Sequence, residues 1–290
     1  MVVAVVVPFL NEVAYLPRLL DSLAAQTRSP DRLLLVDDGS SDGSQDVASA
    51  FVREHPDATL LRRPTRAACA DRLAGAHELR AFKWALGQIA EPWDVAAKLD
   101  ADLELTRATI ATIIGAFEAD PGLGVAGAFL REQGADGVVH RLRIGSDHVH
   151  GATKFYRRQC WQDIAPVPEI LGWDTIDEVT ARLRGWRTVT MAIPGGDPLH
   201  LRPRATHDGV LRGYRRFGEC AWGIGEAPVH VALFTLRALG ARPRGLGGVN
   251  YGAGWVAAAL GRRPRASVEV RAAVRREQLL RIRRRLRAMI

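Results

Sequence analysis

The stretch "LLLVDDGSSDG" (residues 33–43) runs four apolar residues directly into two adjacent aspartates and then into a turn of glycine and serine. A continuous apolar run of this length is typical of a strand that is buried on both faces of a sheet. Asp37 and Asp38 follow that strand at once. The sequence therefore predicts that both carboxylates lie at the end of a buried strand, where a ligand can reach them.

The neighbouring sequence alternates apolar runs with segments of helical periodicity. Runs that predict strands cover residues 2–7, 32–36, 95–99, 124–130 and 187–193. Helical spacing of apolar residues predicts helices around residues 15–23, 47–52, 79–89 and 110–117, the first capped by Asn11. This alternation predicts an α/β domain with a mainly parallel sheet.

The charge divides the chain into two regions. Residues 1–200 carry a net charge of −6 and residues 201–290 one of +14, which together give the net charge of +8. We expect a catalytic or binding domain over residues 1–200 and a helical, basic region over residues 201–290.

Several classes of protein are excluded by missing patterns. No GxGxxG follows the first strand and no GxxxxGK[ST] occurs, so dinucleotide sites of the Rossmann type and P-loops lack their phosphate-binding turn. The three cysteines (Cys69, Cys160 and Cys220) have no CxxC spacing and read as reduced thiols of a cytosolic protein. The first apolar run is expected to be a strand and not a signal peptide, and no apolar stretch is long enough to span a membrane.

A second acidic group follows the strand predicted at residues 95–99, in "KLDADLEL" (98–105). Asp100 and Asp102 are two apart in an extended segment, so both carboxylates project to the same side. Two such oxygen donors suit Mg²⁺ or Mn²⁺ shared with a diphosphate. A solvated turn is the alternative, because two aspartates at this spacing recur by chance.

Three stretches now carry a resemblance to a known family. "VVVPFLNEVAYLPRLLDSL" (5–23), "LLLVDDGSSDGS" (33–44) and "AAKLDADLEL" (96–105) resemble, in this order, the N-terminal motifs of family 2 glycosyltransferases. "GATKFYRRQCW" (151–161) and "GWDTIDEVTARLRGW" (172–186) resemble the acceptor-side motifs. The resemblance covers roughly residues 2–200. It implies the nucleotide-diphospho-sugar transferase fold known as GT-A, a divalent metal, and inverting transfer from a UDP- or GDP-sugar.

The resemblance also implies roles on the donor side. The loop after the first strand, with Pro8, Asn11 and Glu12, matches the loop that lies against the nucleotide. Asp37 matches the acid that contacts the base of the nucleotide, and Asp38 supports it. The chain departs from the family pattern between residues 69 and 86, which leaves open the diphosphate contacts expected from Arg72, Arg80 and Lys83.

The metal ligands are implied in the same way. Asp102 matches the direct metal ligand, and Asp100 the acid near the ribose and the metal. His200 matches a histidine that reaches the metal or the diphosphate, although a structural histidine is an alternative and His207 competes for the role. Arg157 and Arg158 could face an anionic acceptor or the leaving diphosphate, with surface arginine as the simpler account.

Inversion requires a base that takes the proton of the acceptor hydroxyl. Asp174 lies eleven residues before Gly185, the spacing from base to glycine that the family shows, and Asp177 is the alternative. Asp174 could instead be the N-cap of a helix, with Asp177 completing a capping box. The two readings are compatible, since a helix N-terminus stabilises an ionised carboxylate.

The basic region contains two apolar stretches, residues 227–240 and 247–261, which are too short to span a bilayer. Residues 267–290 then mix apolar residues with many arginines, as in a helix that lies in the interface of an anionic membrane. The alternative is that the apolar stretches pack on the catalytic domain and the last helix is solvated. We predict a peripheral protein on the cytoplasmic face of the cell membrane, with a glycan or lipid-linked acceptor.

A different class of function also accounts for the basic tail, namely a non-enzymatic protein that binds an anionic surface or nucleic acid. The tail has few aromatic residues and matches no known nucleic-acid module, so specific nucleic-acid binding is not expected. Both acidic motifs are intact, which favours the enzyme.

Overall fold

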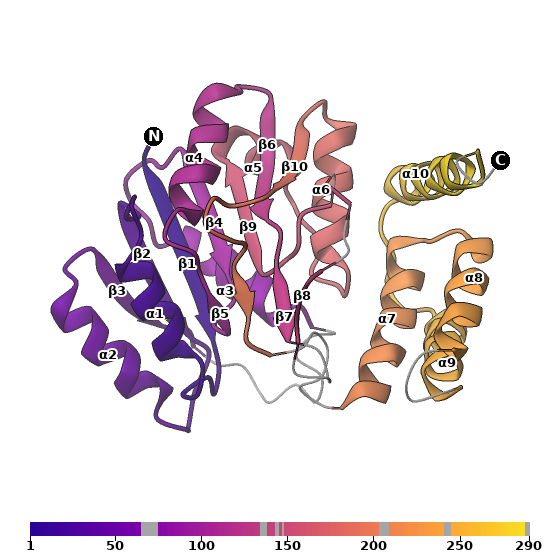
Figure 1. Cartoon of the computed structure of the whole chain (residues 1–290), viewed down its shortest axis with the longest axis horizontal. Coiled ribbons are helices and arrows are strands. Elements are labelled where there is room, and N and C mark those ends of the chain that lie inside the picture. Colours follow the sequence, from indigo (N-terminus) through magenta and orange to yellow (C-terminus); the bar gives the residue numbers. More distant parts are fainter. Residues whose placement is uncertain are drawn as a thin grey trace. The chain divides into compact units, whose positions relative to one another are not determined.

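The computed structural model describes residues 1–64, 75–133, 138–142, 145–146, 148–202, 209–240 and 245–287. The chain forms two compact units (Figure 1). The first, here the sheet unit, comprises Met1–Ala70, His77–Ala165 and Arg184–Pro203. The second, here the helical unit, comprises Asp71–Ala76, Pro166–Leu183 and Arg204–Ile290.

A seven-stranded sheet forms the centre of the sheet unit, in the order β10-β6-β9-β4-β1-β2-β3. Its strands are β1 Val3–Phe9, β2 Arg32–Asp37, β3 Ala58–Arg62, β4 Val95–Leu99, β6 Leu123–Ala128, β9 Thr153–Arg157 and β10 Arg187–Met191. Neighbouring strands pair in parallel except for β9, which is antiparallel to both β4 and β6. The expected α/β fold with a mainly parallel sheet is confirmed.

Helices cover the sheet on both faces, which explains the continuous apolar run of β1. Val3, Val5 and Val7 belong to one core with the apolar faces of α1 and α4, while Ala4 and Val6 between them are equally buried. The helix α3 packs on β1 and β2. The helices of this unit are α1 Leu16–Ala24, α2 Ser44–Glu54, α3 His77–Leu86, α4 Thr109–Ala119 and α5 Arg158–Ile164.

The register of the central strands brings three loops to one edge of the sheet. β1 lies between β2 and β4 and is parallel to both. Phe9 pairs with Asp37, and the backbone N–H of Asp38 donates to the carbonyl of Phe9 at 2.9 Å. The segments that follow β1, β2 and β4 therefore leave the sheet at the same carboxyl edge, where ligands bind in sheets of this type.

Asn11 does not cap α1, contrary to the sequence-based expectation. The helix begins at Leu16, and Tyr15 occupies the cap position without a side-chain hydrogen bond. Asn11 has a left-handed φ of 55°, and its side-chain oxygen accepts from the N–H of Ser41 at 2.8 Å. Glu12 also contacts the segment after β2, because its N–H donates to Ser44 Oγ at 2.7 Å. The loop after β1 is thus tied to the loop after β2.

The helical unit contains α6 Trp173–Leu183, α7 Val210–Ile224, α8 Pro228–Leu239, α9 Leu246–Leu260 and α10 Val268–Arg287. Val270 and Val274 of α10 are buried against Ile176 and Val179 of α6. Arg182 of α6 adds two hydrogen bonds to Glu277 of α10, at 2.9 and 3.0 Å. Part of the apolar face that the sequence assigned to a membrane interface is therefore used for packing inside this unit.

Two further expectations from the sequence, the domain boundary and the lack of a membrane-spanning helix, can be compared with the structure. Residues 166–183 belong to the helical unit, whereas the sequence places the domain boundary near residue 200. The functional division into residues 1–200 and 201–290 stays a prediction. Among the residues that the structure describes, no helix has the length and apolar character needed to cross a membrane.

Candidate functional site

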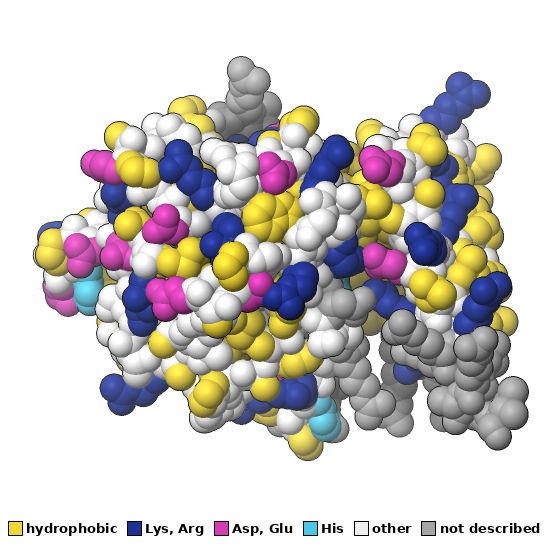
Figure 2. All heavy atoms as spheres, turned by 90° about the horizontal axis from the view of Figure 1, so that it is seen from above, with side chains coloured by type: hydrophobic (Ala, Val, Ile, Leu, Met, Phe, Trp, Pro, Cys, Tyr) yellow, Lys and Arg dark blue, Asp and Glu magenta, His cyan; other side chains and the backbone are white. Residues whose placement is uncertain are grey.

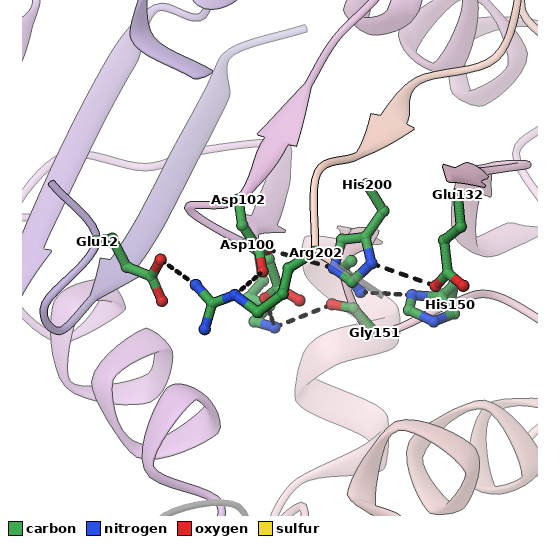
Figure 3. Close-up of polar contacts among 10 residues, drawn as sticks. Glu12, Asp100, Asp102, Glu132, His150, Gly151, His200 and Arg202 are labelled. Carbon is green, nitrogen blue, oxygen red and sulfur yellow. Dashed lines mark hydrogen bonds and ion pairs between the residues drawn. The ribbon is translucent and has the colours of Figure 1, made fainter. Parts of the chain in front are cut away.

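Three predicted metal ligands lie together at the carboxyl edge of the sheet. Asp100, Asp102 and His200 each offer a ligand atom, and these atoms lie within 4.8 Å of one another (Figure 3). Asp100 follows β4 directly. His200 is brought to it by a second, four-stranded sheet in the order β5-β11-β7-β8. Its strands are β5 Leu103–Glu104, β7 Arg131–Gln133, β8 Val139–Arg141 and β11 Leu199–His200.

His200 lies between two carboxylates. Its Nε2 is 3.3 Å from Asp102 Oδ1, and its Nδ1 is 3.3 Å from Glu132 Oε1, the residue opposite it on β7 (Figure 3). Burial by itself lowers the pKa of His200, but hydrogen bonds with Asp102 and Glu132, together with the nearby acidic charges, raise it to about 9. Burial raises the pKa of Asp102, yet His200 and Arg202 hold it below its usual range.

Two further cations neutralise the cluster. Lys98, which is buried, forms an ion pair with Asp100 and donates to the carbonyl of Gly151 at 3.1 Å. Arg202 forms an ion pair with Glu12 from the loop after β1, and its Nε lies 3.5 Å from Asp102 Oδ2 (Figure 3). The carboxylates of the cluster are therefore paired with the lysine, arginine and histidine side chains around them.

The donor set of this cluster fits a divalent cation. Two carboxylates provide the hard oxygen ligands of Mg²⁺ and Mn²⁺, and one imidazole is compatible with Mn²⁺. Glu132 on the far nitrogen of His200 is the carboxylate that commonly orients a metal-binding histidine.

The two acids after β2 have different partners. Asp37 accepts from the N–H groups of Gly39 at 3.1 Å and Ser40 at 2.8 Å, which shapes the turn. Asp38 accepts from Arg63 Nε at 2.7 Å and lies 3.6 Å from His77. Both side chains are buried.

Pro8, Asn11 and Glu12 border the same edge. Pro8 lies one residue before the end of β1, and the other two begin the loop that follows it. The structure thus gathers the predicted nucleotide loop, the acids after β2 and the metal ligands along one edge of the sheet.

Lys83 is not brought to this edge. It lines a hollow of about 620 Å³ together with Arg158, Trp161 and the segment Glu91–Trp93, which leads into β4. This hollow lies at the amino end of β4, opposite to Asp100. Arg72 is outside the residues that the structure describes, as is His207.

Arg157 has a structural role. Its guanidinium donates to the backbone carbonyls of Phe117 at 2.7 Å, Asp120 at 2.9 Å and Leu123 at 2.9 Å. It therefore holds the connection between α4 and β6, and these contacts provide no support for a role with an acceptor or diphosphate.

The two candidate bases lie on α6, in the helical unit. The helix begins at Trp173, so Asp174 is in its first turn and is not the N-cap. The capping-box interpretation needs Asp174 at the N-cap, and a helix that begins at Trp173 does not support it. Asp177 Oδ1 accepts from the N–H of its own neighbour Glu178 at 2.5 Å. Asp177 is 1% exposed, while Asp174 is only partly buried. Exposure thus favours Asp174 as the carboxylate that can meet a substrate.

Sequence reasoning missed three residues of the cluster. Lys98 and Arg202 each lie two positions from a metal candidate (Asp100 and His200), and this spacing along an extended segment was a usable signal. Glu132 carried no such signal, because only the pairing of β7 with β11 places it beside His200.

The relatives of this chain are glycosyltransferases. Over 168 residues it is 30% identical to a "PGL/p-HBAD biosynthesis glycosyltransferase" of Mycobacterium bovis (strain BCG / Pasteur 1173P2), a match of 56% of this chain and 62% of the relative. The chain thus spans less than two thirds of the length of that curated relative.

Solved structures share the fold. The mannosyltransferase PcManGT from Pyrobaculum calidifontis, in complex with GDP-Man and Mn²⁺, superposes with a TM-score of 0.55 at 20% identity, over 97% of this chain and 80% of that one. S. aureus TarS, in complex with UDP-GlcNAc, gives a TM-score of 0.52 at 18% identity, over 83% of this chain and 68% of that one. This confirms the expected similarity to the GT-A fold.

The profile described as "Glycosyl transferase family 2" matches residues 4–168, more than half of the chain. That range contains β1, β2 and β4 and the acids that follow them. The family expected from the motifs is confirmed: the chain belongs to glycosyltransferase family 2.

Proposed function

We propose that this protein is an inverting, metal-dependent glycosyltransferase that moves a sugar from a UDP- or GDP-sugar to a hydroxyl group, in the synthesis of a cell-surface glycan or glycolipid. The observation that supports it most is the cluster of Asp100, Asp102 and His200 at the edge where β1, β2 and β4 end. Relatives of the fold were solved with GDP-Man and with UDP-GlcNAc, so both nucleotides are kept as donors.

The metal ligands in this proposal are Asp102, Asp100 and His200. Mg²⁺ or Mn²⁺, when bound, neutralises the diphosphate of the donor and the charge that develops on the leaving nucleoside diphosphate. PcManGT was solved with Mn²⁺, which favours this ion as the first to test. Glu132 keeps the imidazole of His200 oriented toward Asp102.

The nucleotide of the donor is proposed to bind along the loops after β1 and β2. Asp37, which also accepts from the N–H groups of the turn, contacts the base of the nucleotide, and Asp38, held by Arg63, supports it. Pro8, Asn11 and Glu12 form the neighbouring wall. Lys83 is not part of this wall, because its hollow lies at the opposite end of β4.

The transfer is a single displacement at the anomeric carbon. The acceptor oxygen forms a bond to that carbon as the bond to the diphosphate oxygen breaks, and Asp174 takes the hydroxyl proton. The products are the glycoside of inverted configuration and the nucleoside diphosphate. Asp177 is the alternative base. The assignment of Asp174 is supported by the family motif and by its partial exposure, since Asp177 is buried.

The proposed location is the cytoplasmic face of the cell membrane, with a glycan or lipid-linked acceptor. The strongly basic helical unit supports contact with an anionic membrane surface. No specific nucleic-acid partner is proposed.

A nucleotide panel tests the proposal. Thermal unfolding is measured with UDP, GDP, ADP and CMP, each with Mn²⁺ or with a chelator, and hydrolysis of UDP- and GDP-sugars is then measured for the nucleotide that stabilises most. We expect stabilisation by UDP or GDP that depends on the metal, and slow release of that nucleotide from its sugar. Indifference to every nucleotide, combined with tight and salt-sensitive binding of DNA, would support the non-enzymatic alternative.

A further inference from the structure

The helix α9 exposes its large aliphatic side chains, and apart from Tyr251 the residues that it buries are glycine and alanine. Its buried residues are Gly247, Gly248, Tyr251, Gly254 and Ala258. Its exposed stripe consists of Leu246, Val249, Ala253, Val256 and Leu260. Leu260 is 81% and Val249 is 59% exposed. A helix that faces water normally shows polar residues on this side, so α9 has the reverse arrangement.

The helix α8 repeats this arrangement. It buries only Val231 and Ala238, whereas five large apolar side chains are exposed: Val229, Leu233, Phe234, Leu236 and Leu239. The most exposed of them is Leu236, at 64%. Arg237 is the sole charged residue in the sequence of the two helices. Figure 2 shows hydrophobic side chains along the outer margin of the helical unit, beside arginines.

Glycines explain how these helices pack closely although Tyr251 and Val231 are the only large apolar side chains that α8 and α9 bury. A Cβ added to Gly254 of α9 would lie 2.1 Å from the carbonyl oxygen of Arg215 on α7, and one added to Gly218 of α7 would lie 1.9 Å from the carbonyl oxygen of Tyr251. The two backbones are thus in direct contact. Close packing through small residues, with large apolar residues facing outward, is the arrangement of helices that lie in an apolar medium.

The charge around this surface identifies the medium. From residue 227 to residue 268 the sequence has no aspartate or glutamate and has six arginines: Arg237, Arg242, Arg244, Arg262, Arg263 and Arg265. Of these, Arg237, Arg262 and Arg263 are described and exposed. An apolar surface with exposed arginines on the same helices and at their ends is complementary to an anionic bilayer, where each basic residue near the headgroups adds about 1 kcal/mol. A symmetric contact with a second copy would instead place these arginines against one another.

We propose that the outward faces of α8 and α9, here the α8–α9 face, insert into the boundary between headgroups and acyl chains of an anionic membrane. This inference rests on the membrane location in the proposed function and names the surface responsible. α9 has 15 residues and is about 22 Å long, shorter than the roughly 30 Å of a hydrocarbon core. We therefore infer that the helices lie in one leaflet and do not cross the bilayer.

The same observations assign a secondary role to α10. Val270 and Val274 are buried in the helical unit, so the apolar surface of this helix is interrupted. Its described outward side carries Arg275, Arg276, Arg281 and Arg283 beside Leu279 and Leu280. α10 adds attraction to anionic headgroups, and the α8–α9 face supplies the insertion.

Two matched variants separate these surfaces. The first, L236S/V249S/L260S, removes three exposed apolar side chains from the α8–α9 face. The second, V268S/L279S/L280S, removes three exposed apolar side chains from α10. All six positions are exposed, and unchanged circular dichroism and thermal unfolding verify that both variants fold.

The measurement is co-sedimentation of the full chain with vesicles of phosphatidylcholine and phosphatidylglycerol, or of phosphatidylcholine alone. Wild type should sediment with the anionic vesicles and retain part of that binding in high salt, since insertion is not screened. The α8–α9 variant should partition at least about tenfold more weakly. The α10 variant should bind like wild type. A third variant, R262Q/R263Q, should bind the anionic vesicles more weakly than wild type at low salt. The difference between the two should shrink as the salt concentration is raised.

Three outcomes would overturn the inference. In the first, wild type remains in the supernatant with anionic vesicles. In the second, the α8–α9 variant binds like wild type. In the third, the α10 variant alone loses binding. Light scattering provides a fourth such outcome, in which wild type is a dimer and the α8–α9 variant is a monomer. The nucleotide-induced thermal shift is recorded for every variant, so that a failure of the transferase proposal is seen separately from a failure of lipid binding.

Discussion

The Nε2 atom of His200 lies 3.3 Å from the Oδ1 atom of Asp102, in segments that the second sheet brings side by side. This contact joins the acidic motif after β4 to a histidine from the far end of the sheet unit's sequence. At neutral pH the contact is an ion pair, because the pKa of His200 is raised to about 9.

Replacing Asp102 tests the metal site. Asp102→Asn removes an anionic oxygen, and we expect sugar transfer in Mn²⁺ to fall about 100-fold or more while the protein stays folded. Mn²⁺ binding, measured by calorimetry, should weaken in parallel. Asp21→Asn on the exposed side of α1 is the matched control and should behave like wild type. Transfer at the wild-type rate by Asp102→Asn in saturating Mn²⁺ would show that the ligand assignment is wrong.

The two aspartates of α6 can be distinguished by kinetics and stability. Asp174→Asn should lose transfer by about 100-fold or more and retain nucleotide affinity, because the base acts on the acceptor. Asp177→Asn alters a buried side chain that accepts from a backbone N–H, so it should lower the melting temperature as well. If Asp177→Asn alone lost transfer with its nucleotide affinity and stability intact, Asp177 would be the base.

The His200–Asp102 pair predicts a pH dependence of stability for the metal-free protein. The pKa of His200 rises from 6.5 to about 9 on folding, so its stabilisation is complete below about pH 6.5 and disappears as the pH rises through about 9. The shift corresponds to at most about 3 kcal/mol. The pKa of Asp102 is lowered, so its contribution is lost at acid pH instead. Denaturant unfolding in a chelator should show this alkaline decline, and His200→Gln should largely abolish it.

Replacing a closely packed glycine and an exposed glycine by alanine should change the free energy of unfolding in opposite directions. Gly254→Ala forces a Cβ against the backbone of α7 and should destabilise this unit by about 3 kcal/mol. Gly115→Ala on α4 meets no atom within 4 Å and should stabilise the sheet unit by roughly 1 kcal/mol. Tryptophan fluorescence during unfolding can follow the first change, because Trp222 and Trp255 pack edge to face at 5.6 Å. Equal effects of the two substitutions would contradict the packing argument.

The sequence by itself determined the strands that carry the acidic motifs. β1, β2 and β4 come from apolar runs that are buried on both faces of the sheet, and the residues after them are fixed by position along the chain. Sequence position alone therefore puts four acids at strand ends, namely Asp37, Asp38, Asp100 and Asp102. Local signals also marked α8 and α9 as apolar segments.

Only the tertiary structure decided which side chains surround those acids. Glu132 reaches His200 only through the pairing of β7 with β11, which leaves no local pattern in the sequence. The spacing of Lys98 and Arg202 from Asp100 and His200 was a signal, but the ion pairs that they form depend on the fold. It also decided which side of α9 is buried. Glycine and leucine both fit the sequence of a helix, but the backbone contact with α7 turns the glycines inward and leaves the leucines exposed.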